Sequence, residues 1–232
     1  MAAELNDKES SAQEAEGLID VRRLLAETSV EELNRLAEDY FARLTDWSYH
    51  LSKPFGSIDE TPQLLINFAV VLQGLSLCPG MTVLEFGAGT GWASRFLSQL
   101  GCRVIAADVS PTALRMAEEH YKLLPVVGDK PAPRFLHFDG HRLDLPDSSV
   151  DRVMCLDAFH HVPNPAGVLS ELCRVLKDGG IAGFAEPGPE HSKSAQSQYE
   201  MKTFKVVEND VNVREIWLEA QAGGFTEVRL AV

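Results

Sequence analysis

The stretch Val83-Leu84-Glu85-Phe86-Gly87-Ala88-Gly89-Thr90-Gly91 decides the fold. An apolar run of strand type ends in a turn with three glycines, and a helical pattern begins directly after it. Glycines let the backbone turn sharply and let a ligand approach it closely. Asp108 follows 17 residues after Gly91, at the end of the next apolar run, where a carboxylate can accept both hydroxyls of a ribose. The sequence therefore predicts a strand, turn and helix that bind a nucleotide.

From Thr82 onward, short apolar runs alternate with helical patterns. We expect strands at 82–86, 103–108, 134–138, 151–157, 181–186 and 225–232, and helices at 91–100, 111–123, 165–177 and 212–222. Continuous apolar strands that alternate with helices predict a parallel sheet covered on both faces. The predicted class is α/β, a Rossmann-like, doubly wound and mainly parallel sheet with a helical N-terminal extension.

The N-terminal part has its own organisation. Residues 1–17 are acidic and polar, and we expect them to form a disordered tail. Residues 18–75 are interpreted as a helical extension or lid, because Ser29–Glu32 forms a capping box and Thr61-Pro62 begins a helix that runs to Leu75. We expect an irregular connector at 46–60.

Composition excludes several classes of protein. The net charge of −13 argues against a nucleic-acid partner, which needs a basic surface. No apolar run is long enough for a membrane span, and the N-terminus lacks the features of a secretory signal. The cysteines form no metal-binding CxxC pair and are interpreted as reduced thiols of a cytoplasmic protein: Cys78, Cys102, Cys155 and Cys173.

Two classes of ligand fit the glycine-rich turn. A dinucleotide fingerprint needs a third glycine where this chain has Trp92. Glu85 would repel a pyrophosphate but would suit the amino group of a methionine moiety. An NAD-dependent oxidoreductase is therefore the less favoured alternative.

Residues 75–230 resemble the class I S-adenosylmethionine-dependent methyltransferases in four motifs that occur in order. The first is VLEFGAGTGWAS at 83–94. The second match covers 134–151, the third is the strand and "HHV" ending at 152–162, and the fourth is the helix end at 172–180. Asp178 replaces the proline that is usual in the fourth motif.

The resemblance implies S-adenosylmethionine as cofactor and S-adenosylhomocysteine as product. It implies that Glu85 is oriented toward the amino group of the methionine part. The turn that wraps this part contains Gly87, Ala88, Gly89 and Gly91.

The resemblance also implies the rest of the cofactor site. Asp108 is expected to hold the ribose, with Val109 beside the adenine. Asp139 is expected to accept a hydrogen bond from the exocyclic amine of the adenine. The Gly140 backbone is expected to face the edge of the adenine ring. Asp157 is expected to border both the sulfonium and the methyl acceptor.

The catalytic residues are expected directly after the fourth strand in the sequence. His160 and His161 are candidate bases for an acceptor that loses a proton, with packing as the alternative role. Asp157 completes the candidate catalytic set, and we expect no metal ion in the site.

The acceptor is expected to be a small molecule or a glycan, with O-methylation favoured over N-methylation. A later polar stretch is interpreted as binding a polyhydroxylated acceptor, with a divalent metal as the less favoured alternative, through Glu186, His191, Glu200 and Glu208. Residues of the N-terminal connector are candidates to close the same pocket: Tyr49, His50 and Lys53.

Two further hypotheses stay open. One is that the chain is a non-catalytic cofactor-binding module or a partner subunit. The other is that residues 76–232 form a class I domain that lacks its final strand, because the apolar end at 230–232 stops within a strand-like segment. We therefore expect the chain to be the methyltransferase part of a longer polypeptide.

Overall fold

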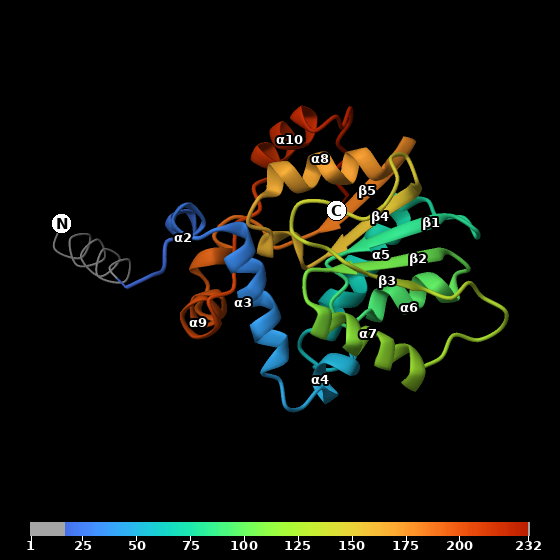
Figure 1. Ribbon diagram of the computed structural model, residues 1–232, viewed down its shortest axis with the longest axis horizontal. Coiled ribbons are helices and arrows are strands. Elements are labelled where there is room, and N and C mark those ends of the chain that lie inside the picture. The colour runs from blue at the N-terminus through green and yellow to red at the C-terminus, as the bar shows by residue number, and fades with distance from the viewer. Residues whose placement is uncertain (1–16, 232) are drawn as a thin grey trace, which may run out of the picture.

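The computed structural model describes residues 17–231, so all but the last residue of the expected disordered tail lies outside the described part. Its centre is one parallel sheet with helices on both sides (Figure 1). The strands are β1 (Thr82–Phe86), β2 (Arg103–Asp108), β3 (Arg134–His137), β4 (Val150–Leu156) and β5 (Leu176–Ala185). The helices are α2 (Val21–Glu27), α3 (Val30–Ala42), α4 (Ser48–Leu51), α5 (Thr61–Leu75), α6 (Trp92–Gln99), α7 (Pro111–Leu123), α8 (Pro165–Val175), α9 (Ala195–Phe204) and α10 (Val213–Ala222). Two 3₁₀ turns complete the set, η1 (Phe159–His161) and η2 (His191–Lys193).

The strand order is β3-β2-β1-β4-β5, with every neighbouring pair parallel. The predicted fold class is confirmed. The chain changes direction across the sheet between β1 and β4, and α/β sheets bind ligands beyond the carboxyl ends of their strands at such a point.

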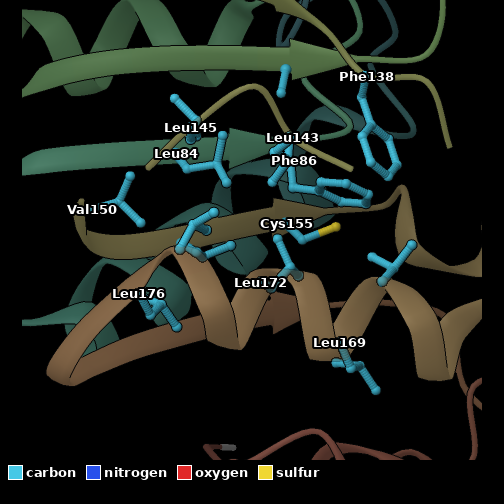
Figure 2. Close-up of a cluster of buried hydrophobic side chains, with 14 of the residues drawn as sticks. Leu84, Phe86, Phe138, Leu143, Leu145, Val150, Cys155, Leu169, Leu172 and Leu176 are labelled. Atoms are coloured by element: carbon cyan, nitrogen blue, oxygen red, sulfur yellow. The ribbon is translucent and has the colours of Figure 1, made fainter. Parts of the chain in front are cut away.

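Both faces of the sheet are buried, as the continuous apolar strands predict. Leu84 and Phe86 of β1 point to the layer that contains α8, together with other apolar side chains (Figure 2). Val83, which directly precedes Leu84 in β1, packs instead with Val71 and Leu75 of α5. Because successive strand residues face opposite sides, this alternation fixes β1 between two apolar layers.

Helices α2 and α3 of the N-terminal part lie beside α9 at one end of the sheet (Figure 1). A small apolar cluster joins them, in which Val21 and Leu33 meet Met201 and Val207. Glu38 of α3 accepts hydrogen bonds from Ser110 and Thr112 at the start of α7. These contacts place α3 across the carboxyl ends of the strands.

The predicted strand at 225–232 is wrong, because residues 225–231 adopt no regular structure. Phe225 packs against the core, but Val228 and Leu230 are 47% and 73% exposed. A strand needs a hydrogen-bonded neighbour and a face to bury, and the alternating pattern of this segment supplies neither by itself.

Smaller differences concern boundaries. β5 begins at Leu176, five residues before the expected start at 181, and takes the last two residues of the helix expected at 165–177. The connector at 46–60 contains the short helix α4, and the polar stretch after β5 contains α9.

Substitution of Gly87 is expected to lower stability strongly. An added Cβ would lie 2.4 Å from Ala158 Cβ, and the φ of +69° disfavours any side chain. Gly87→Ala should lower the free energy of unfolding by about 2–4 kcal/mol in urea denaturation. Gly80→Ala is the matched control, because Gly80 has φ +86° but open space around it, and its cost should stay at about 1–2 kcal/mol. Equal losses in the two variants would contradict this packing argument.

Candidate active site

A cavity of about 730 Å³ lies over the carboxyl ends of β1, β2 and β4. Its floor includes backbone of the glycine-rich turn together with Asp108 and Val109. Its roof comes from α3, with Asn34, Tyr40 and Phe41. The far end is polar and is lined by three histidines, His160, His161 and His191, and by two glutamates, Glu200 and Glu208.

The glycines of the glycine-rich turn have two different roles. Gly87 and Gly89 line the cavity, and nothing lies within 4 Å of a Cβ built on Gly89. A ligand can therefore approach this backbone directly. Gly91 does not line the cavity among the described residues; its added Cβ would meet Ala117 at 2.8 Å, so it permits α6 to pack on α7.

Asp108 is the buried carboxylate of this end of the cavity, 8% exposed. Its oxygens accept hydrogen bonds from the N–H groups of Gly89 and Ser110, each at 2.8 Å. Burial raises the pKa of Asp108, and these hydrogen bonds partly offset the effect. A carboxylate has about four acceptor positions, so two bonds leave capacity for the hydroxyls of a ribose.

Besides Gly91, two more of the expected cofactor residues are not among the described residues that line the cavity. Glu85 is buried behind the turn, is not among the described residues that line the cavity, and accepts a hydrogen bond from Ser94. Asp139 is exposed, and its Oδ1 accepts from the N–H groups of His141 (2.8 Å) and Arg142 (2.7 Å). These hydrogen bonds hold the pKa of Asp139 below its usual value, so its carboxylate closes a turn beside the cavity.

Gly140 lines the cavity directly below α3. A Cβ on this residue would lie 2.0 Å from Asn34 Nδ2. This amide nitrogen is buried and has no hydrogen-bond partner among the described residues. An unpaired buried donor beside glycine backbone and Asp108 fits a nucleoside, whose base offers ring nitrogens as acceptors.

At the polar end, Glu186 anchors the turn after β4. Its carboxylate accepts hydrogen bonds from the backbone N–H groups of Ala158 (3.1 Å), Phe159 (2.9 Å) and His160 (3.2 Å). Its Oε2 also lies 2.8 Å from His160 Nδ1. Burial alone would lower the pKa of His160, but the hydrogen bond and charge of Glu186 outweigh it and raise that pKa. Glu186 therefore fixes both the backbone and the ring orientation of His160.

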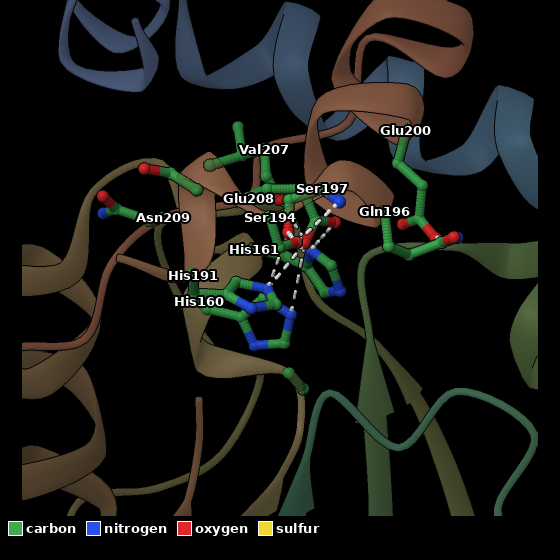
Figure 3. Close-up of polar contacts among 12 residues, drawn as sticks. His160, His161, His191, Ser194, Gln196, Ser197, Glu200, Val207, Glu208 and Asn209 are labelled. Carbon is green, nitrogen blue, oxygen red and sulfur yellow. Dashed lines mark hydrogen bonds and ion pairs between the residues drawn. The ribbon is translucent and has the colours of Figure 1, made fainter. Parts of the chain in front are cut away.

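Glu208 lies among the three imidazoles at the centre of the polar end (Figure 3). Its Oε2 is 2.8 Å from His191 Nε2 and 3.9 Å from His160 Nε2, and its Oε1 is 3.3 Å from His161 Nδ1. Burial raises the pKa of Glu208 to about 8, against the effect of the nearby His160. We call the five residues His160, His161, His191, Glu186 and Glu208 the histidine–glutamate cluster.

His161 differs electrostatically from its neighbour. Desolvation in the wall of the cavity, followed by the charge of His160, lowers the pKa of His161. Its side chain is still 43% exposed, because it faces the cavity. Its Nδ1 lies 2.6 Å from the Val207 carbonyl oxygen, a contact that orients the ring.

Asp157 lines the cavity between the two ends. Its φ of +53° places it in the left-handed region, which is strained for a non-glycine residue but tolerated best by Asn and Asp. Its N–H donates to the Ala185 carbonyl at 2.8 Å. The end of β4 thus holds Asp157 in the wall of the cavity.

Most expected residues meet in one cavity, including the acceptor-side residues of the N-terminal connector, Tyr49, His50 and Lys53. Sequence reasoning missed Asn34 and the rest of the α3 roof, since nothing in that helix indicates which surface it covers. It named Glu186 as a ligand for the acceptor or, less favoured, for a divalent metal, and not as the partner of His160. The hydrogen bond between Glu186 and His160 spans 26 residues of sequence and has no local signal.

Glu85 predicts a pH-dependent stability. Burial raises its pKa to about 8, so the folded state retains a proton that the unfolded state loses near the ordinary value of 4.5. Stability therefore falls as the pH rises from about 4.5 to 8, by roughly 1.4 kcal/mol per pH unit at most. Without cofactor, Glu85→Gln should have a flatter profile of melting temperature against pH than the wild type, with its largest relative gain above pH 8. Parallel profiles for the two proteins would show that Glu85 does not titrate in this way.

The sequence is similar to those of known methyltransferases. Residues 84–184 match the family model described as a methyltransferase domain. The sterol 24-C-methyltransferase of Eremothecium gossypii is 25% identical over 186 residues, which are 73% of this chain and 49% of that protein. The 2-methyl-6-phytyl-1,4-hydroquinone methyltransferase of Synechocystis sp. is 37% identical over 152 residues, 65% of this chain and 41% of that protein.

A solved structure gives the same fold. The S-adenosylmethionine-dependent methyltransferase of Aquifex aeolicus superposes with a TM-score of 0.58 at 22% identity, covering 83% of this chain and 90% of that one. The chain spans about half the length of the curated relatives it matches, from 46% to 53% for three of them. Among the helices of residues 17–231, none combines the length and apolarity needed to cross a membrane.

Proposed function

This chain carries a class I S-adenosylmethionine-dependent methyltransferase domain, and from that premise we propose that it methylates a small or glycan-like acceptor, with oxygen as the favoured target. The observation that carries the proposal is a single cavity with two chemically different ends. One end has glycine backbone and Asp108, which suit a nucleoside. The other end has the histidine–glutamate cluster, which suits a polar acceptor.

At the cofactor end, each residue has a distinct task. Asp108 would accept the ribose hydroxyls, and the Gly87 and Gly89 backbone would lie against the methionine part. Asn34 Nδ2 would donate to the base, with Val109 beside it. Bound S-adenosylmethionine supplies the methyl group on a positively charged sulfur, and the protein supplies position.

Glu85 and Asp139 take indirect roles in this proposal. Buried behind the turn, Glu85 would act on the amino group of the cofactor through the turn or through water rather than by direct contact. Asp139 would shape the loop that presents the Gly140 backbone. Gly91 would position α6 against α7.

At the acceptor end, a hydroxyl group must lose a proton when its oxygen is methylated. His160 and His161, with Asp157 at the border of the two ends, are the groups proposed to activate that hydroxyl. Glu186 would hold His160 in place. Glu200 lines the same cavity and is available to a second hydroxyl of a polyhydroxylated acceptor.

The proposal also assigns a separate role to each of two parts of the chain. Residues 18–75 would form an extension that roofs the cofactor pocket through α3, and residues 76–232 the catalytic domain. The hydrogen bonds from Ser110 and Thr112 to Glu38 support this roof.

The proposed acceptor can be tested with S-adenosylmethionine that carries a labelled methyl group. The full chain would be incubated with a panel of polyols, glycans, phenols, thiols and amines. Label is expected in ether linkage on a hydroxylated acceptor. Label only on nitrogen, sulfur or carbon would contradict oxygen as the target, and binding of S-adenosylhomocysteine without any transfer would favour a non-catalytic module.

A further inference from the structure

Three imidazoles converge on one buried carboxylate in the histidine–glutamate cluster (Figure 3). They come from separate segments: His160 and His161 from η1, His191 from η2, and Glu208 from the segment after α9. A ring nitrogen of His160, one of His161 and a carboxylate oxygen of Glu208 all lie within 4.8 Å of one another. Residues this distant in sequence meet here because β4 and β5 end side by side.

The protonation of His160 follows from its surroundings. Glu186 accepts hydrogen bonds from three backbone N–H groups, and its Oε2 lies 2.8 Å from His160 Nδ1. A carboxylate held by three donors is an acceptor, so the proton of the neutral ring lies on Nδ1 and the lone pair on Nε2. That nitrogen faces Glu208, 3.9 Å from Oε2. A histidine that donates one ring N–H to a carboxylate and turns the other nitrogen inward has the arrangement usual for a metal ligand.

Glu208 provides an independent observation. The residue is 3% exposed, and its Oε1 has no hydrogen-bond partner among the residues that the structure describes. Its Oε2 is already held by His191 Nε2 at 2.8 Å. A buried carboxylate oxygen without a partner is costly, and a cation beside it would remove that cost.

We propose that His160, His161 and Glu208 bind one divalent first-row transition-metal ion, with Glu186 and His191 orienting two of these ligands. Two imidazoles and one carboxylate suit zinc, iron, cobalt or nickel, whereas magnesium and calcium favour oxygen ligands. Three protein ligands leave a coordination position free, as in catalytic zinc sites. Since His160 and His161 line the cavity, that position faces the acceptor end.

The chemical use of this ion rests on the proposed function. An acceptor hydroxyl bound to the ion has a lowered pKa and releases its proton to water. Its oxygen then forms the bond to the methyl carbon while the carbon–sulfur bond breaks, and the sulfur keeps the electron pair as a neutral thioether. His160 and His161 would thus activate the acceptor by holding the ion. The cation site itself needs neither cofactor nor acceptor.

The test is a titration of the chelator-treated full chain with Co²⁺, followed by visible absorption, with Mn²⁺ and Zn²⁺ measured by equilibrium dialysis. We expect one ion per chain. Glu208→Gln and His160→Ala should each weaken binding by about 100-fold or more, and Glu186→Gln by about 10–100-fold. His141→Ala, a variant of an exposed histidine outside the residues that line the cavity, is the control expected to bind as the wild type does.

S-adenosylhomocysteine binding is measured on every variant, because it reports folding at the other end of the cavity. A saturable Co²⁺ site that Glu208→Gln removes while S-adenosylhomocysteine still binds supports the proposal. Absence of saturable binding of all three ions to the wild type, or unchanged binding by Glu208→Gln, overturns it. Metal binding without S-adenosylhomocysteine binding would instead refute the proposed function and leave the cation site standing.

Discussion

Asp108→Ala is expected to weaken the binding of S-adenosylhomocysteine by about 100-fold or more. Hydrogen bonds to a charged group contribute about 1.5–3 kcal/mol each, and the proposed site uses Asp108 for two ribose hydroxyls. The substitution also leaves the N–H groups of Gly89 and Ser110 without their acceptor. Isothermal titration calorimetry measures the loss directly.

Asp144→Ala is the matched control for this variant. Asp144 is an exposed aspartate whose only described ion pair is with Arg134, at 3.7 Å. Its removal should leave the affinity within about two-fold, since exposed pairs contribute about 1 kcal/mol or less to stability and this one lies outside the residues that line the cavity. Equal affinities in Asp108→Ala and the wild type would show that the cofactor does not bind at this strand end.

His160→Ala is expected to lower turnover by about 10²–10⁴-fold on an acceptor that loses a proton. The affinity for S-adenosylhomocysteine should stay nearly unchanged, because His160 lies at the polar end of the cavity, next to Glu186 and Glu208. Single-turnover transfer of a labelled methyl group separates this loss from a change in binding.

His137→Ala serves as the control, because His137 is exposed and does not line the cavity among the described residues. It should retain wild-type turnover. Wild-type turnover in His160→Ala as well would place acceptor activation elsewhere in the cavity.

The sheet was predictable because its signals are local. The run 82–86 is mostly apolar, glycines that favour a turn follow it at 87, 89 and 91, and Asp108 ends the next apolar run. A strand buried on both faces needs no information about its partners to be recognised. The segment 225–231 shows the limit of this reasoning: its alternating pattern suits a strand, but pairing depends on a neighbour that the pattern cannot specify.

The site was predictable in part for the same reason. The glycine-rich turn, Asp108 and His160 all lie at the carboxyl ends of strands. The carboxyl ends of parallel strands meet at one edge of the sheet. The α3 roof was not predictable, because Asn34 meets Gly140 only through tertiary packing. Helix α9 was missed because its sequence, AQSQYEMKTF, has little apolar periodicity, and its Ser194 cap resembles any loop serine.

Calorimetric titration of the full wild-type chain with S-adenosylhomocysteine and, separately, with NAD⁺ tests the identity of the cofactor. S-adenosylhomocysteine is expected to bind saturably at one site per chain, and NAD⁺ is expected to give no saturable heat. Glu85 behind the turn and Trp92 in place of a third glycine are the residues that favour this choice. Saturable binding of NAD⁺ with no binding of S-adenosylhomocysteine would contradict the central claim.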